Sequence, residues 1–177
     1  MIHRTLTILL TVALGLFLAP VRADDTNTIT LKSKDGQVQL VMPDGWVSQQ
    51  SSNSSAAIEA ANEDGNAFVM VLVVGRDDPY LPLDDYAKQR RDEVLSHLVN
   101  SKYAGPDEMR VNGAKALQYE LHGTSPVSKM DFGFFLTVAQ MKRHYVEVIS
   151  WTSERHFAGN AGLLKSAAKS VTYSGEQ

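Results

Sequence analysis

The 177-residue chain contains no cysteine. Without thiols it can form no disulfide bond, no zinc–thiolate site and no cysteine nucleophile, so these classes of protein are excluded. Glycine and proline are not enriched, with 12 and 6 residues, which excludes collagen-like and low-complexity sequences. Hydrophobic residues make up an ordinary 44% of the chain. The composition therefore indicates a globular domain held together by packing alone.

Motifs for catalysis and nucleotide binding are missing as well. The sequence contains no G-x-S-x-G, no G-x-G-x-x-G and no P-loop. Ser166-Ala167-Ala168-Lys169 matches S-x-x-K, but the S-D-N and K-T-G partners of that motif are absent. We therefore expect a protein that is not an enzyme and needs no cofactor.

Residues that commonly bind metals are scattered. The histidines beyond residue 23 form no H-x-H or H-E-x-x-H spacing, and they are His97, His122, His144 and His156. The acidic residues near Asp84 do not follow the D-x-D-x-D-G spacing of a calcium loop, so they are better explained as a helix cap and a solvated loop. No metal site is predicted.

The first 23 residues are typical of a secretory signal peptide. Arg4 precedes 14 uncharged, mostly apolar residues at 6–19, and Val21-Arg22-Ala23 places small residues before Asp24. As a helix, such a segment would be about 21 Å long, short of the roughly 30 Å hydrocarbon core, which argues against an uncleaved anchor. We predict cleavage between Ala23 and Asp24 and a periplasmic or secreted protein.

Charge and hydropathy restrict the partners of the remaining residues, 24–177. Of 17 basic residues, Arg4 and Arg22 leave with the leader, so 15 basic and 20 acidic residues remain and the net charge is −5. No stripe of Lys and Arg is present, so we expect no nucleic-acid partner. No later apolar run is long enough to span a membrane, so no membrane association is expected after signal removal. One domain is predicted for 24–177.

The order of predicted elements indicates an α+β protein. Alternation of apolar residues and turn residues predicts strands at 28–32, 38–42, 56–62, 67–74, 109–111, 114–122, 129–140 and 144–151. Helical spacing predicts one helix from Leu83 to about Asn100 and another from Glu154 to Val171, and Gly105-Pro106 predicts a loop at 101–108. The strand at 67–74 is apolar on both faces and is placed at the sheet centre. A mostly antiparallel central sheet flanked by helices follows.

Three aromatic residues are candidates for a ligand groove. Phe132, Phe134 and Trp151 fall at strand spacing and could line a groove for a hydrophobic molecule. The alternative is that they belong to the core or its rim, as aromatic side chains at such positions commonly do.

Several segments resemble the PsbP-like family. The segments are QVQLVMPDGW (37–46), the helix LDDYAKQRRDEVL, the hairpin VNGAKALQYEL, the strand RHYVEVISWTS and the closing helix ERHFAGNAGLLKSAAKSV. They extend over nearly all of 28–173 and are also similar to Mog-type and periplasmic DcrB-type proteins. The resemblance implies an α/β/α sandwich and a non-catalytic role in protein–protein contact. The plain secretory leader is not a transit peptide, which argues against a photosynthetic role.

Three hypotheses for function follow. The leading one is an exported, non-enzymatic protein-interaction domain that assists envelope assembly or stress tolerance. The second is a periplasmic carrier of a small hydrophobic ligand, and the third is a hydrolase, which would need a histidine and an acid to converge in one cleft. A protein partner is expected, although the sequence specifies neither its identity nor an oligomeric state.

Overall fold

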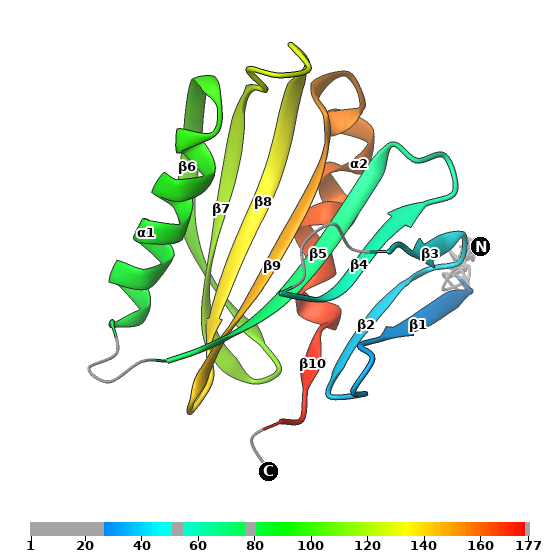
Figure 1. The fold of residues 1–177 in the computed structure, drawn as a ribbon, viewed down its shortest axis with the longest axis vertical. Helices are drawn as coiled ribbons and strands as arrows, with labels where there is room; N and C mark the ends of the chain where they lie inside the picture. Colours follow the sequence, from blue (N-terminus) through cyan, green and yellow to red (C-terminus); the bar gives the residue numbers. More distant parts are fainter. Residues whose placement is uncertain (1–26, 51–54, 77–80, 176–177) are drawn as a thin grey trace, which may run out of the picture.

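The computed structural model describes residues 27–50, 55–76 and 81–175. The signal peptide and the Ala23–Asp24 cleavage site predicted above lie outside these residues. Most of the described chain belongs to one large sheet with a helix on either side of it (Figure 1).

The large sheet has seven strands, and each pairs with its neighbours in antiparallel fashion. In spatial order the strands are β3 (Trp46–Ser48), β4 (Ala56–Asn62), β5 (Ala67–Gly75), β9 (His144–Ser153), β8 (Asp131–Gln140), β7 (Ala114–Thr124) and β6 (Val99–Val111). The predicted α+β class with a large antiparallel sheet is confirmed. The strand placed at the sheet centre from its hydropathy, β5, lies beside the true middle strand, β9.

A small second sheet was not predicted. It consists of β1 (Thr28–Lys32), β2 (Val38–Pro43) and β10 (Thr172–Tyr173), with β2 in the middle. Val38, Leu40 and Met42 of β2 are buried in the same cluster as residues of the large sheet. The strand β10 has only two residues, too few for an alternating pattern to reveal it.

The two helices pack against different core clusters. Helix α1 (Leu83–Ser96) contacts β6, β7 and β8, whereas α2 (Glu154–Ala167), continued by the 3-10 turn η1 (Ala168–Ser170), contacts β5, β8 and β9. Successive residues of β9 point to opposite faces, so Tyr145 packs in the α1 cluster and Val146 in the α2 cluster. The residues of β9 from Tyr145 to Ser150 are therefore all buried, including the polar Glu147 and Ser150.

Three sequence-based predictions of element type or boundary were wrong. Residues 101–108 do not form a loop, because β6 runs from Val99 to Val111 through Gly105 and Pro106. Proline has no N–H to donate, and it is accommodated here on an edge strand whose pairing with β7 shifts between Ala104 and Asp107. The first helix ends at Ser96 rather than near Asn100, and α2 ends at Ala167 rather than Val171.

Gly133 is needed for the packing of α2. A Cβ atom at this position would lie 2.2 Å from the ring of Phe157, which α2 lays over β8. We predict that Gly133→Ala lowers the free energy of unfolding by about 1–3 kcal/mol, since the ring must move within a packed core. Chemical denaturation measures this change.

Gly159 provides the matched control. It lies within α2, and a Cβ atom there would have no heavy atom within 4 Å. Gly159→Ala should therefore stabilise the protein by about 0.5–1 kcal/mol through helix propensity. Equal effects of the two substitutions would contradict the contact between Phe157 and Gly133.

Candidate functional site

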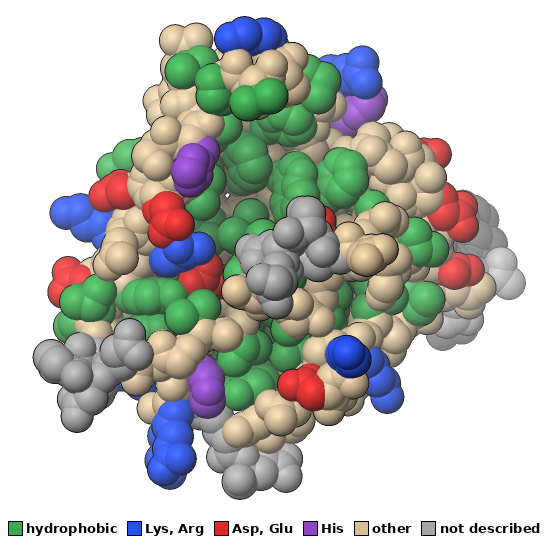
Figure 2. Space-filling view, viewed as in Figure 1, with side chains coloured by type: hydrophobic (Ala, Val, Ile, Leu, Met, Phe, Trp, Pro, Cys, Tyr) green, Lys and Arg blue, Asp and Glu red, His purple; other side chains and the backbone are tan. Residues whose placement is uncertain are grey.

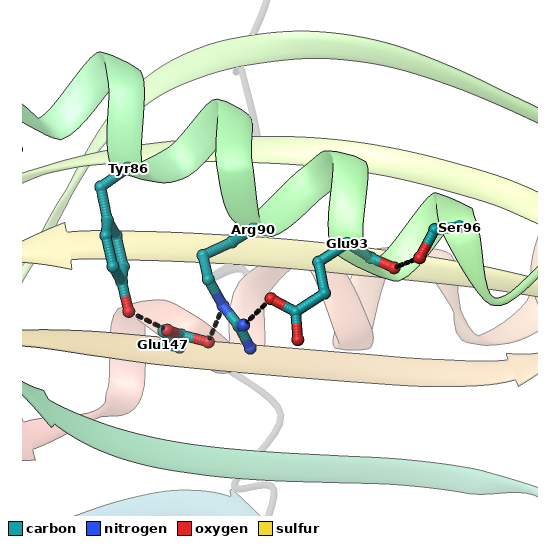
Figure 3. A network of polar contacts seen from close by, with 5 residues as sticks. All are labelled: Tyr86, Arg90, Glu93, Ser96 and Glu147. Atoms are coloured by element: carbon teal, nitrogen blue, oxygen red, sulfur yellow. Dashed lines mark hydrogen bonds and ion pairs between the residues drawn. The ribbon is translucent and has the colours of Figure 1, made fainter.

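A buried carboxylate anchors α1 to the sheet. Glu147 of β9 is fully buried, accepts a 2.6 Å hydrogen bond from the Tyr86 hydroxyl and accepts a 2.9 Å bond from Nε of Arg90 (Figure 3). Arg90 also forms an ion pair with Glu93, one turn further along α1. The arginine thus neutralises the buried carboxylate of Glu147. Without a cationic partner, this charge would lower the stability of the fold by several kcal/mol.

Tyr86 contributes packing as well as a hydrogen bond. Its ring stacks on Tyr145 of β9 with the ring centroids 3.7 Å apart. Burial, followed by the hydrogen bond to the Glu147 carboxylate, raises the pKa of Tyr86 well above its usual value. The phenol therefore stays protonated and remains a donor to Glu147 at all physiological pH values.

A second arginine fixes the opposite side of α1. The guanidinium of Arg91 lies 4.3 Å from the ring centroid of Tyr103 and 5.3 Å from that of Tyr119. These tyrosines belong to β6 and β7. Together, Arg90 and Arg91 hold α1 over the half of the sheet that runs from β9 to β6.

One helix cannot cover the rest of this face. Seven strands about 4.8 Å apart give a sheet about 29 Å wide, whereas a helix with its side chains is about 10–12 Å across. The part of this face that α1 does not cover carries five partly exposed apolar side chains on β5, β8 and β9, here called the aromatic shelf: Phe68, Met70, Phe132, Phe134 and Trp151. Figure 2 shows hydrophobic side chains gathered in a hollow between α1 and the β4 side.

The strand register brings the shelf together. Trp151 lies directly opposite Phe68 on one side and Phe134 on the other. The Phe68 and Trp151 rings are stacked with centroids 5.3 Å apart, and the Phe132 and Phe134 rings are 6.1 Å apart. Since opposite residues in an antiparallel pair point to the same face, all these rings share the α1 face of the sheet.

The same row continues to the edge of the sheet. Phe68 lies opposite Ala61, and Ala61 lies opposite Val47 of β3, whose side chain is 46% exposed. An apolar row therefore runs from β3 to β8 without a polar side chain. At the other end of the row, Leu121 of β7 lies beneath α1 and is completely buried.

The three groove residues proposed from the sequence lie together on one face. Phe132, Phe134 and Trp151 are neighbours, half-buried rather than enclosed in the core. Sequence reasoning missed Phe68, Met70 and Val47, because their place beside Trp151 depends on strand pairing between distant segments. The unbroken apolar run of β5 was the one available indication, since it predicts apolar side chains on both faces.

On the opposite face, His122 lies between two carboxylates. Its Nδ1 is 2.8 Å from Glu154 of α2, and its Nε2 is 2.9 Å from Glu120 of β7. The imidazole also contacts the ring of Phe157 edge to face. Burial would lower the pKa of His122, but the hydrogen bonds and charges of Glu120 and Glu154 outweigh it, so the pKa is raised.

This cluster is poorly arranged for hydrolysis. Both ring nitrogens of His122 face carboxylates, so neither is available to take a proton from a nucleophile. Another histidine, His156, has its Nδ1 3.2 Å from the hydroxyl of Ser153, the residue that precedes α2. The two residues are only three positions apart, so this is a local contact at the start of the helix.

Within residues 27–50, 55–76 and 81–175, no three His, Asp or Glu side chains are grouped as metal ligands. In the same residues, no helix is long and apolar enough to cross a membrane.

Comparisons with known proteins identify the fold. No family model matches the chain, and no curated protein matches it in sequence. Among solved structures it is similar to the cyanobacterial PsbP of Synechocystis (TM-score 0.61, 10% identity, 90% of this chain and 100% of that chain). It is also similar to LpqN of Mycobacterium tuberculosis, described as involved in cell envelope biogenesis (TM-score 0.62, 9% identity, 84% and 91%).

A third similar structure is a protein of Bacteroides thetaiotaomicron (TM-score 0.57, 9% identity, 83% of this chain and 48% of that chain). At such low identities the similarity concerns the fold alone. The chain has a PsbP-like fold, which confirms the resemblance found in the sequence.

The Glu147 anchor can be tested by substitution. Arg90→Met should lower the free energy of unfolding by about 3 kcal/mol, because it leaves the buried Glu147 carboxylate without its cation. Adding Glu147→Leu should restore most of that loss, since the double variant buries no charge. Urea denaturation of the single and double variants measures both changes.

Glu93→Gln is the control for this pair, because the Glu93 side chain is 49% exposed. An exposed ion pair contributes little, so this substitution should change stability by less than about 0.5 kcal/mol. If Arg90→Met lowers the free energy of unfolding no more than Glu93→Gln does, the burial of the Glu147 carboxylate does not depend on its ion pair with Arg90.

The His122 cluster should make stability depend on pH. The folded-state pKa is raised, so protonated His122 stabilises the fold fully below its unfolded pKa of about 6.5. This contribution, about 1 kcal/mol because both carboxylates are partly exposed, is lost as pH rises through the folded value. His122→Gln should therefore destabilise the protein more at pH 5.5 than at pH 9.

Denaturation curves at the two pH values give this difference, with His97→Gln as the control at an exposed site after α1. If His122→Gln lowers the free energy of unfolding equally at both pH values, the charged bridge from His122 to Glu120 and Glu154 is contradicted.

Proposed function

We propose that this chain is an exported, non-catalytic accessory domain of the cell envelope that binds a partner protein through the aromatic shelf. The observation that carries this proposal is the partly exposed apolar face beside α1, formed by the shelf and extended by Val47. Large apolar patches on soluble proteins commonly mark interaction sites. Aromatic residues and methionine, which make up the shelf, are enriched where proteins bind one another.

The location and process rest on two further supports. The leader at residues 1–23 has the order of regions found in secretory signal peptides. LpqN, which shares the fold, is described as involved in cell envelope biogenesis. Both are consistent with an exported protein that assists envelope assembly.

A carrier of small hydrophobic molecules is the second candidate. The hollow beside α1, floored by aromatic rings, favours it (Figure 2). Native mass spectrometry of the exported protein separates the two functions, because a carrier should retain a small molecule at a fixed stoichiometry.

A photo-crosslinking amino acid at Val47 tests the leading function. Val47 adjoins the shelf and is already exposed, so the replacement should not disturb the core. We expect one discrete crosslinked protein when the variant is irradiated in the cells that export it.

Val41 offers a matched control, since it is 38% exposed but lies on β2 of the small sheet. The crosslinker at Val41 should not capture the same protein. Identical products from both positions, or none from Val47, would exclude the shelf as the binding surface.

A further inference from the structure

A cleft lies on the α2 face of the sheet, opposite the aromatic shelf. One wall is the last turn of α2 together with η1, the other wall is residues 106–109 of β6, and Gln118 of β7 lies at the floor. Its volume is about 590 Å³, within the range of roughly 300–1,000 Å³ found for pockets that hold small molecules. The cleft is therefore large enough for a small ligand.

A bulge in β6 shapes the strand side of the cleft. The pairing of β6 with β7 shifts between Ala104 and Asp107, and Gly105, within the shift, has a φ of 99°, a left-handed value that favours glycine. A Cβ atom at Gly105 would lie 2.8 Å from the backbone oxygen of Gln118, so no larger residue fits there. Bulges commonly re-aim side chains beside active sites. Here the residue after the shift, Asp107, reaches Lys165 of α2.

Gln118 provides an oriented acceptor at the floor of the cleft. Its side-chain nitrogen donates one hydrogen bond to Thr137 Oγ1 (2.8 Å) and another to the backbone oxygen of Lys165 (3.0 Å). A backbone carbonyl only accepts, so the orientation of the amide is fixed. Although Gln118 is only 4% exposed, its Oε1 receives no hydrogen bond from the described residues and is not enclosed by them. This oxygen is accessible from the cleft and accepts a donor from a ligand.

Ionic groups of both signs border the cleft. Lys165 Nζ lies 2.9 Å from Asp107 Oδ2, and this ion pair joins α2 to β6. Both side chains are more than half exposed, so the pair contributes little and can rearrange around a ligand. Lys169 of η1 also lines the cleft, and it forms no ion pair within the part of the chain that the structure describes. Glu108 is already paired with Lys115 and is not counted. A ligand thus meets one carboxylate and two ammonium groups.

From these groups we infer that the cleft binds a small zwitterion, an amino acid or a dipeptide, with an apolar side chain. The ammonium group of the ligand donates to Gln118 Oε1 and pairs with Asp107, while its carboxylate lies between Lys165 and Lys169. Met109 of the β6 wall provides the apolar contact. A zwitterion compensates both members of the Asp107–Lys165 pair, whereas a ligand of one sign would leave the other member without a partner. This site is independent of the aromatic shelf and goes beyond the proposed function.

Calorimetric titration of the purified protein with the common amino acids and the glycyl dipeptides tests the inference. We expect saturable one-to-one binding of at least one of these compounds. N-acetylation of that compound removes its positive charge, and amidation of its carboxyl group removes its negative charge. Each change should weaken binding at least about tenfold, because hydrogen bonds between charged groups are the strong ones. Absence of binding across the panel, or equal binding of the modified forms, would overturn the inference.

Two substitutions at exposed positions assign the ends of the ligand. Asp107→Asn should weaken the zwitterion about fivefold but leave the affinity of its N-acetylated form within about twofold, since that form has no ammonium group to lose. Lys169→Gln should weaken the zwitterion about fivefold and leave its amidated form within about twofold, for the corresponding reason.

Lys102→Gln is the control, at an exposed position of β6 that does not line the cleft, and it should leave all these affinities unchanged. A structural disturbance would weaken every form of the ligand alike. Equal losses for the zwitterion and its modified forms, or losses in Lys102→Gln as large as in Lys169→Gln, would therefore rule out the site.

Discussion

The need to compensate one buried charge determines how α1 is placed on this fold. Glu147 lies in the middle strand of the large sheet, and Tyr86 and Arg90 of α1 provide its hydrogen bonds (Figure 3). A helix that must reach this carboxylate and also place Arg91 over Tyr103 and Tyr119 can lie over only one half of the sheet. As a consequence, α1 does not extend over the other half of that face.

The two faces of the sheet consequently have different roles. One face is covered by α2, η1 and the small sheet, whose residues join a single buried cluster with those of β4, β5, β8 and β9. On the other face, the row from Val47 to Leu121 is completely buried at Leu121 beneath α1, whereas Val47, Phe68, Trp151 and Phe134 remain partly exposed. The asymmetry gives the domain one face that is covered by its own elements and one that keeps a partly exposed apolar surface beside α1.

Much of this architecture could be predicted from the sequence, and the exceptions have physical causes. The alternating pattern of β2 and the helical stripe that begins at Leu83 are local periodicities, and they located β2 and the start of α1 correctly. Of edge strand β6 only residues 109–111 were predicted, because Gly105 and Pro106 normally end strands, although an edge position tolerates them. Local patterns indicate which residues are apolar but not which strands become neighbours.

The candidate site, too, could be predicted from the sequence only in part. Phe132, Phe134 and Trp151 were chosen from strand spacing, and the β8–β9 register places them together. Phe68 joins them only through the β5–β9 pairing, and Glu147 becomes a buried anchor only because α1 returns over β9. These relations connect residues that are distant in the sequence, so no local pattern contains them.

The central claim is that the aromatic shelf is open on the isolated protein and covered in the cell. Hydroxyl-radical footprinting of Trp151 and Met70, in the purified protein and in the intact envelope, tests it most directly. The account predicts strong modification of both side chains in the purified protein and marked protection in the envelope, with Val41 of the small sheet unchanged. Equal modification of Trp151 and Met70 in the two preparations would contradict it.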